Sequence, residues 1–248
     1  MEKEPLISVI TVTYNAEGVI GKTLSSLKEQ TYEDFEHLVI DGCSKDNTLQ
    51  VIKSYSLPQS RVISEPDKGL YDAMNKGLNL AKGKYVIFLN AGDAFHNKDT
   101  LRKYAEGAFQ DKDIIYGDTI IVDNGRNKIS DRHLFVPEKL TFESFADGML
   151  ICHQAFMVKK VLTGHYDLRY RFSADYDWCV KCIEKSNTDN CMNLKAVTID
   201  YLSDGLTDNN KWKSLRERFK VMSRHYGLPK TLIKHFGFVF RAIRRGRL

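Results

Sequence analysis

Several apolar segments near the start of this chain are each followed directly by polar or acidic side chains. The clearest case is Asp93, which follows the apolar run 85–89 after the turn Asn90-Ala91-Gly92. In open α/β sheets, ligands bind at the carboxyl ends of the strands, so a carboxylate at such a position is well placed to contact one. Asp93 can therefore hold a divalent cation, and that cation can in turn hold a diphosphate.

Three more strand-like segments end in the same way. The polar residues that follow them are Thr13-Tyr14-Asn15, Asp41 and Asp67-Lys68-Gly69. Asp41 can accept a hydrogen bond from a base N–H, and Lys68 can contact a base carbonyl or a phosphate. Each residue alone is typical of a turn or a helix cap. Four strand ends on one sheet edge, however, would surround a single crevice.

The hydrophobic pattern supplies the elements that must bring these residues together. Apolar, β-branched runs predict strands over 6–14, 35–40, 61–64 and 85–89, and helical periodicity predicts helices over 19–30, 48–55 and 70–81. Such alternation is typical of a parallel sheet covered by helices on both faces. The second half is less regular, with strands predicted over 113–116, 119–122 and 195–201 and helices over 139–145 and 174–184. We therefore expect an α/β fold with a mixed, mostly parallel sheet.

Motifs and composition exclude several classes of protein. Neither Gly-x-Gly-x-x-Gly nor Gly-x-x-x-x-Gly-Lys-Ser/Thr occurs, so a dinucleotide-dependent dehydrogenase or a P-loop enzyme is not expected. The five cysteines are widely spread, which favours reduced thiols, with a zinc site at Cys179, Cys182 and Cys191 as the alternative. The chain has neither a membrane-length apolar run nor the features of a signal peptide at its start, so a cytoplasmic location is expected.

The positive charge of the chain is confined to its C-terminal part. The net charge is +5, but residues 211–248 carry twelve Lys or Arg and one acid, Glu217, which leaves −6 for the rest. This distribution argues against a nucleic-acid-binding core. Two helical patterns with apolar and basic faces, broken at Gly227-Leu228-Pro229, predict a basic amphipathic extension that suits an anionic membrane surface. A helix packed on the core with a solvated basic face is the alternative.

Two segments resemble a known enzyme family. Residues 8–15 (SVITVTYN) look like the opening strand of family 2 glycosyltransferases with the GT-A fold, and residues 65–77 (EPDKGLYDAMNKG) resemble a segment common in their polysaccharide-building members, colanic-acid-type enzymes among them. The resemblance covers about residues 6–202. It implies a GT-A Rossmann-like domain over 1–210, with a nucleotide-binding half over about 1–93 and an acceptor half over about 94–210, followed by the helical extension 211–248.

The resemblance also implies a donor, a cation and the residues that bind them. The donor is a nucleotide-diphosphate sugar, with a UDP-sugar favoured, and its nucleotide contacts fall to Thr13, Tyr14, Asn15, Asp41, Asp67 and Lys68. Asp93 matches the last residue of the family's metal-binding Asp-x-Asp motif, whose earlier carboxylate is replaced here by Asn90 or Ala91. Mg²⁺ or Mn²⁺ held by one carboxylate would depend on diphosphate oxygens and water, and both ions often retain water ligands.

A catalytic base is implied by residues 173–178, which resemble the family's Glu-Asp motif at a helix start. Asp175 takes the Asp position and Ala174 replaces the Glu, while Asp177 is the fallback. Both acids also suit a helix N-terminus for purely structural reasons. His153 and Trp178 are expected on the acceptor side, and a core histidine is an equally open interpretation of His153.

The implied activity is inverting sugar transfer to a hydroxyl of a saccharide or lipid-linked saccharide in surface polysaccharide biosynthesis. The expected location is the cytoplasm, with the extension binding the inner face of the plasma membrane. Two alternatives stay open at this point: a non-catalytic nucleotide-sugar-binding or scaffold protein on the same fold, and a nucleotidyltransferase. The missing Gly-rich phosphate loop counts against the second of these.

Overall fold

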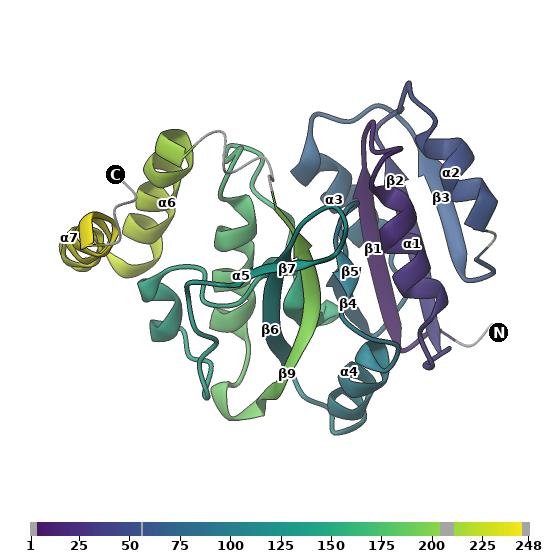
Figure 1. Cartoon of the computed structure of the whole chain (residues 1–248). Helices are drawn as coiled ribbons and strands as arrows, with labels where there is room; N and C mark the ends of the chain where they lie inside the picture. Colours follow the sequence, from purple (N-terminus) through teal and green to yellow (C-terminus); the bar gives the residue numbers. More distant parts are fainter. Residues whose placement is uncertain (1–3, 56, 204–210, 245–248) are drawn as a thin grey trace.

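The fold is built around one nine-stranded sheet (Figure 1). The computed structural model describes residues 4–55, 57–203 and 211–244. The strands are β1 (Ile7–Thr13), β2 (Phe35–Asp41), β3 (Ser60–Ser64), β4 (Tyr85–Phe88), β5 (Ala94–Phe95), β6 (Ile114–Val122), β7 (Lys128–Asp131), β8 (Phe156–Lys159) and β9 (Cys191–Leu202). The helices are α1 (Ile20–Lys28), α2 (Thr48–Tyr55), α3 (Leu70–Leu80), α4 (Thr100–Phe109), α5 (Ala174–Lys185), α6 (Lys211–Tyr226) and α7 (Leu228–Arg244). Short 3-10 helices are η1 (Glu143–Asp147), η2 (His153–Ala155), η3 (Lys160–Leu162) and η4 (Thr188–Asn190).

The first half forms the predicted parallel part of the sheet. β1 pairs in parallel with β2 and β4, and β2 pairs in parallel with β3. Side chains alternate across β2: Val39 packs with α1 and α2, whereas Leu38 and Ile40 join the cluster that contains the apolar face of α3. Helices therefore cover both faces, which is why the strands of this half read as continuous apolar runs.

The second half extends the same sheet with mixed pairing. The strand order is β3-β2-β1-β4-β8-β6-β9-β5, with β7 added to β6. β8 runs antiparallel to both β4 and β6, and β9 runs parallel to β6. The α/β fold class is confirmed. The sequence patterns missed α4, β5, β7 and β8, of which the three strands are short.

Two predicted elements of this half differ in the structure. The strands expected over 113–116 and 119–122 are the single strand β6, whose pairing with β9 shifts register next to Gly117. A Cβ on Gly117 would lie 2.5 Å from Cγ2 of Thr198, so the missing side chain allows the close approach. The prediction of a helix over 139–145 is wrong, because the structure has only the short η1 there. A hydrogen-bonded turn from Thr141 to Ser144 leads into η1, and Gly148, with φ 112°, follows it.

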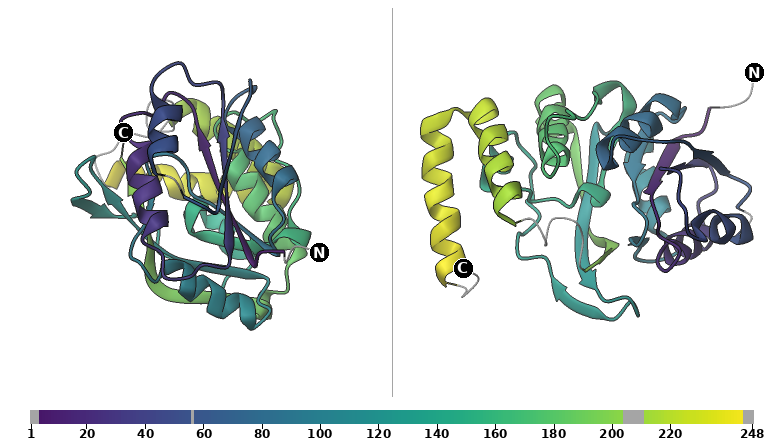
Figure 2. Two further views of the ribbon diagram at one scale, coloured as in Figure 1. Left: turned by 90° about the vertical axis from the view of Figure 1, so that its right-hand side faces the viewer. Right: turned by 90° about the horizontal axis from the view of Figure 1, so that it is seen from above.

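The C-terminal helices lie at the end of the molecule opposite β3 and α2 (Figure 2). Helix α6 packs against α5, and α7 packs against α6 and η1. Val221 and Met222 of α6 are fully buried, so part of the extension belongs to the core. For residues 245–248 and for the side chains of 239–244, the predicted amphipathic extension lies outside the described residues. Among the described helices, none combines the length and apolar character needed to cross a membrane.

Candidate active site

The ends of β1, β2 and β3 meet at one edge of the sheet. In the strand register, Thr13 lies opposite Asp41, and Asp41 lies opposite Ser64. The carboxylate of Asp41 is fully buried and accepts hydrogen bonds from Ser44 Oγ (2.5 Å), Ser44 N (3.0 Å) and Ser64 Oγ (2.6 Å). A carboxylate has about four lone-pair sites. Asp41 therefore uses most of its capacity to hold the loops after β2 and β3 together.

Tyr14 and Asp67 come together around Gly42. A Cβ on Gly42 would lie 2.5 Å from Asp67 Oδ2 and 3.4 Å from Tyr14 Cδ2, so both side chains approach the bare backbone there. The ring of Tyr14 is 59% exposed, and Asp67 Oδ1 accepts a hydrogen bond from Gly69 N (2.8 Å). The neighbouring Thr13 Oγ1 is buried with no hydrogen-bond partner among the described residues. This edge thus offers a flat aromatic surface and an unpaired hydroxyl.

Asn15 and Lys68 have different relations to this edge. Asn15 has φ 47°; its N–H donates to Ser44 Oγ (2.8 Å), and its Oδ1 accepts from Lys45 N (2.8 Å). It therefore ties the turn after β1 to the turn after β2. Lys68 is exposed, and its backbone N–H donates to Asp72 Oδ2 (2.9 Å) at the start of α3. The Lys68 side chain is thus exposed beside this edge, while its backbone is fixed to α3.

Asp93 sits beyond the end of β4 and is only 5% exposed. Its Oδ2 accepts a hydrogen bond from Gln154 Nε2 (2.9 Å), and its Oδ1 accepts one from Leu202 N (3.0 Å). Burial raises the pKa of Asp93 to about 7, against the opposing effects of these hydrogen bonds and of Arg126. Thr23 of α1 clamps the turn, since its Oγ1 donates to Asp93 O (2.7 Å) and accepts from Gly92 N (3.0 Å).

The oxygens at this turn suit a hard cation only in part. The amide oxygen of Asn90 is buried, and it has no hydrogen-bond partner within the described part of the chain. One carboxylate and one amide oxygen are ligands that Mg²⁺ or Mn²⁺ accepts, with further oxygens needed from elsewhere. Across residues 4–55, 57–203 and 211–244, no three His, Cys, Asp or Glu side chains gather as a metal site. This also removes the zinc alternative at the cysteines, which are all free.

Asp175 lies in the first turn of α5 and is half-buried. Its Oδ1 accepts a hydrogen bond from the hydroxyl of Tyr71 (3.2 Å) and one from the backbone N–H of Tyr176 (2.8 Å). Tyr71 belongs to α3, which follows the Asp67-Lys68-Gly69 turn. The candidate base therefore contacts the helix that follows the predicted nucleotide-binding residues. Sequence patterns gave no role to Tyr71, although it lies within the motif 65–77.

Asp177 lies two residues further along α5 and is fully buried. Its Oδ1 lies 2.8 Å from His225 Nε2, and its Oδ2 lies 2.5 Å from Lys181 Nζ. Burial acts to raise the pKa of Asp177, but the hydrogen bonds from His225 and Lys181 hold it below its usual value. This carboxylate joins α5 to α6. Because both of its oxygens are already paired with side chains, we retain only Asp175 as the candidate base.

His153 and Trp178, both predicted on the acceptor side, are buried in an aromatic cluster. Trp178 is 1% exposed, its Nε1–H donates to Gly164 O (2.7 Å), and its ring stacks on Tyr166. His153 Nε2 lies 2.6 Å from the hydroxyl of Tyr166, and burial lowers the pKa of His153 to about 4. The interpretation of His153 as a core histidine is the one that fits. Both residues therefore belong to the packing between η2 and α5.

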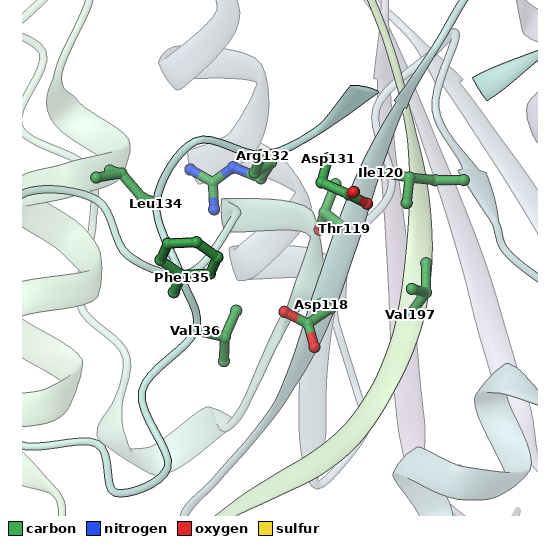
Figure 3. Close-up of a pocket in the computed structure, with 9 residues that line it drawn as sticks. All are labelled: Asp118, Thr119, Ile120, Asp131, Arg132, Leu134, Phe135, Val136 and Val197. Atoms are coloured by element: carbon green, nitrogen blue, oxygen red, sulfur yellow. The ribbon is translucent and has the colours of Figure 1, made fainter. Parts of the chain in front are cut away.

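A cavity of about 240 Å³ lies between β6, β7 and the segment that follows β7 (Figure 3). Figure 3 shows Arg132 and Phe135 on that segment and Asp118 and Thr119 on β6. Phe135 is 86% exposed, and the guanidinium of Arg132 is fixed by hydrogen bonds to the backbone oxygens of Met149 (2.9 Å) and Leu150 (3.1 Å). Sequence reasoning missed this cavity because no local motif marks it.

Side chains connect the lining of this cavity with Asp93. Cys152 Sγ donates to Gln154 Oε1 (3.0 Å), and Gln154 in turn donates to Asp93. The charges of both Arg132 and Asp93 act on the Cys152 thiol, whose pKa is raised mainly by burial. The β6–β7 turn also contributes Arg126, which donates to Gly92 O (2.7 Å) beside Asp93. Cys152 and Gln154 thus connect Arg132 of the cavity lining with Asp93.

Comparison with known proteins places this architecture in a family. The family model described as glycosyl transferase family 2 matches residues 8–164. A PGL/p-HBAD biosynthesis glycosyltransferase of Mycobacterium bovis is 35% identical over 186 residues, 72% of this chain and 70% of that protein. The Escherichia coli protein WfgD, a UDP-Glc:alpha-D-GlcNAc-diphosphoundecaprenol beta-1,3-glucosyltransferase, is 26% identical over 219 residues, covering 88% of this chain and 85% of WfgD.

Solved structures share the fold. Staphylococcus aureus TarS (residues 1–349), in complex with UDP-GlcNAc, superposes with a TM-score of 0.76 at 22% identity, covering 94% of this chain and 73% of that chain. The mannosyltransferase PcManGT from Pyrobaculum calidifontis, in complex with GDP-Man and Mn²⁺, gives a TM-score of 0.62 at 15% identity, covering 100% and 77%. The chain therefore belongs to glycosyl transferase family 2 and is a nucleotide-sugar-dependent glycosyltransferase with a GT-A-like α/β fold.

Proposed function

We propose that this protein transfers a sugar with inversion from a UDP-sugar to a hydroxyl of a saccharide, with Asp175 as the base and Asp93 as the metal ligand. The observation that carries the proposal is the position of η2. Gln154 of η2 donates to Asp93, and the adjacent His153 contacts Tyr166. Tyr166 stacks on Tyr71, whose hydroxyl donates to Asp175. Side-chain contacts therefore connect both carboxylates to η2, although they are far apart in the sequence. This arrangement favours catalysis over a binding or scaffold role.

The donor would lie along the ends of β1 to β4. The exposed ring of Tyr14 can stack on the base, and the unpaired hydroxyl of Thr13 is available to a polar group of the nucleotide. Lys68 is exposed and can approach a phosphate. The complex of TarS with UDP-GlcNAc supports a uridine nucleotide in this fold. Asp41, Asp67 and Asn15 would shape this site through the hydrogen bonds that they already make.

The reaction needs one proton acceptor and a site for the departing diphosphate. As the acceptor oxygen attacks the anomeric carbon, Asp175 takes the hydroxyl proton and the bond from that carbon to the diphosphate breaks. Attack in line with the leaving group inverts the anomeric centre. Mg²⁺ or Mn²⁺ bound near Asp93, with Asn90 Oδ1 at hand, would neutralise the charge of the leaving diphosphate. The Mn²⁺ complex of PcManGT supports a divalent ion.

The acceptor would reach the site through the cavity beside Asp93. The exposed ring of Phe135 can pack against the C–H face of a sugar, and Asp118 and Arg132 can pair with its hydroxyl groups. The name of WfgD specifies an acceptor on diphosphoundecaprenol, which supports a lipid-linked saccharide here. The buried His153 and Trp178 hold α5 in place under this site.

The extension would hold the protein on an anionic membrane surface, in keeping with a lipid-linked acceptor. Leu232, Ile233 and Phe236 of α7 are exposed, and they lie within the basic part of the chain. Lys230 and Lys234 are paired with Glu143 and Asp147 of η1, so α7 is anchored to the acceptor half. An apolar helix surface within a segment of net charge +11 suits anionic lipid.

Turnover of a UDP-sugar in the presence of Mn²⁺ tests the proposed function. Wild-type protein is expected to release UDP from at least one of UDP-Glc, UDP-GlcNAc and UDP-Gal. Asp175→Asn should lower that rate by roughly 10²- to 10⁴-fold while UDP binding, measured by calorimetry, is retained. Binding of UDP-sugar without turnover in the wild type would support the scaffold alternative. Full turnover in Asp175→Asn would remove the base from the proposal.

A further inference from the structure

Asp175 shares one of its oxygens with two donors from different parts of the fold. Oδ1 accepts from the Tyr71 hydroxyl at 3.2 Å and from the Tyr176 N–H at 2.8 Å. Tyr71 is 104 residues away in sequence, on α3. The two contacts fix the rotation of the carboxylate about its Cβ–Cγ bond. Oδ2 is then directed away from these donors.

Tyr71 is itself held rigidly. Its side chain is 8% exposed, and its ring stacks on Tyr166 with the centroids 5.6 Å apart and an interplanar angle of 20°. Tyr166 stacks in turn on Trp178 (5.1 Å, 11°), and its hydroxyl lies 2.6 Å from His153 Nε2. Because His153 is neutral at physiological pH, Nε2 can accept the Tyr166 proton. The stack thus connects α3, η2 and α5 beneath the candidate site.

The hydroxyl of Tyr71 can act only as a proton donor to the ionised carboxylate. Burial and then the charge of Asp175 raise the pKa of Tyr71 well above its usual value, so the phenol keeps its proton at neutral pH. A carboxylate oxygen can only accept from such a group. The contact therefore fixes the direction of Oδ1 and leaves Oδ2 as the oxygen that can accept the proton of an acceptor hydroxyl.

We propose that Tyr71 is a positioning residue for the base, holding Oδ1 of Asp175 so that Oδ2 faces the acceptor hydroxyl. The inference rests on the proposed function, because it assumes that Asp175 is the base. It adds a link between donor and base: Lys68 N–H donates to Asp72 Oδ2 at the start of α3, one residue after Tyr71. The Lys68 turn is thus connected to the base through the first turn of α3.

Other ionisable groups surround Asp175 and must be held constant in any test. His153, Tyr166 and Cys179 each interact electrostatically with Asp175, and Glu217 of α6 interacts with Tyr71. Tyr71→Phe removes one hydroxyl and leaves these groups and the ring stack in place. Tyr85→Phe is the matched control, because the Tyr85 hydroxyl is also buried but donates to Lys112 O (2.7 Å) at the opposite end of β4.

The direct test is the kinetics of UDP-sugar turnover in wild type, Tyr71→Phe and Tyr85→Phe. Tyr71→Phe should lower kcat several-fold without changing the KM for the donor, and Tyr85→Phe should leave both constants unchanged. Carbon-13 NMR of protein labelled at aspartate, with Asp175→Asn used to assign the signal, should show a changed Asp175 carboxyl signal in Tyr71→Phe but not in Tyr85→Phe.

The outcomes separate the inference from the proposed function. An unchanged Asp175 carboxyl signal and an unchanged kcat in Tyr71→Phe, in protein that melts at the wild-type temperature, overturn the positioning role. Full turnover in Asp175→Asn overturns the base assignment even when Tyr71→Phe changes the carboxyl signal. A rise in the KM for the donor together with an unchanged kcat would make Tyr71 a structural residue of the donor site instead.

Discussion

Gln154 Nε2 donates a hydrogen bond of 2.9 Å to Asp93 Oδ2, which joins η2 to the turn after β4 across 61 residues of sequence. Leu202 N occupies the other carboxylate oxygen, so both oxygens of Asp93 have fixed directions. A buried carboxylate with fixed hydrogen-bond partners is an oriented ligand rather than a flexible one. Gln154 thus connects η2 to the candidate metal ligand and fixes the direction of its carboxylate.

We expect Gln154→Leu to weaken Mn²⁺-dependent UDP binding by roughly 10- to 100-fold, because Asp93 loses the partner that orients it. Calorimetric titration of UDP with and without Mn²⁺ measures the effect. Gln110→Leu is the control, since Gln110 is exposed directly after α4 and its amide donates to the helix backbone at Glu106. Equal metal dependence in wild type and Gln154→Leu would show that the contact has no role in binding.

Phe135, whose exposed ring lines the cavity, should contribute to binding of the acceptor and not of the donor. Phe135→Ala is expected to raise the acceptor KM by about tenfold, since packing against a sugar face would be lost, while the donor KM stays unchanged. Transfer from a UDP-sugar to a panel of octyl glycosides measures both constants. Phe109→Ala removes another exposed phenylalanine on α4 and serves as the control. A change in donor KM instead would place Phe135 in the donor site.

Membrane binding by α7 should depend on its exposed apolar side chains. Ile233→Ser combined with Phe236→Ser is expected to lower affinity for anionic phosphatidylglycerol vesicles at least about tenfold, because two large side chains no longer enter the lipid. Vesicle cosedimentation measures the loss. Val161→Ser alters an equally exposed apolar residue on η3 and should bind like wild type. Binding that survives the double substitution would leave charge alone as the cause.

Acid should weaken the fold through its buried histidines. His37 is fully buried between Thr11 Oγ1 and Ser60 Oγ, and burial lowers its pKa to about 3. In the unfolded chain, histidine has a pKa near 6.5 and binds a proton below that pH. In the native state His37 stays neutral, so the free energy of unfolding is full above about pH 6.5 and falls as the pH drops toward 3. His153 acts in the same direction. Asp93, whose native pKa is raised, partly offsets them.

Substitution isolates the contribution of His37. His37→Gln should be less stable than wild type at pH 7, and the difference in free energy of unfolding should shrink by about 2 kcal/mol between pH 6.5 and 5. Urea unfolding at several pH values measures it. A difference that stays constant over this range would mean that His37 titrates normally in the folded protein.

The sequence by itself determined the first half of the fold and the edge where its strands end. Strands and helices there carry strong local hydrophobic periods, so β1 to β4 and α1 to α3 appear close to their predicted bounds. Polar residues after each strand then had to share one edge, because parallel strands all end on the same side. The resemblance to a family added the candidate role of Asp175, which local patterns alone left open.

Only the tertiary structure decided which of these residues face solvent and which contact one another. Asp175 and Asp177 look equivalent in sequence, yet one contacts Tyr71 and the other is enclosed by Lys181 and His225. Trp178 is buried because Tyr166 and Phe88 pack against it from other segments. Burial and pairing of this kind depend on contacts between distant parts of the chain, which the periodicity of a single segment does not encode.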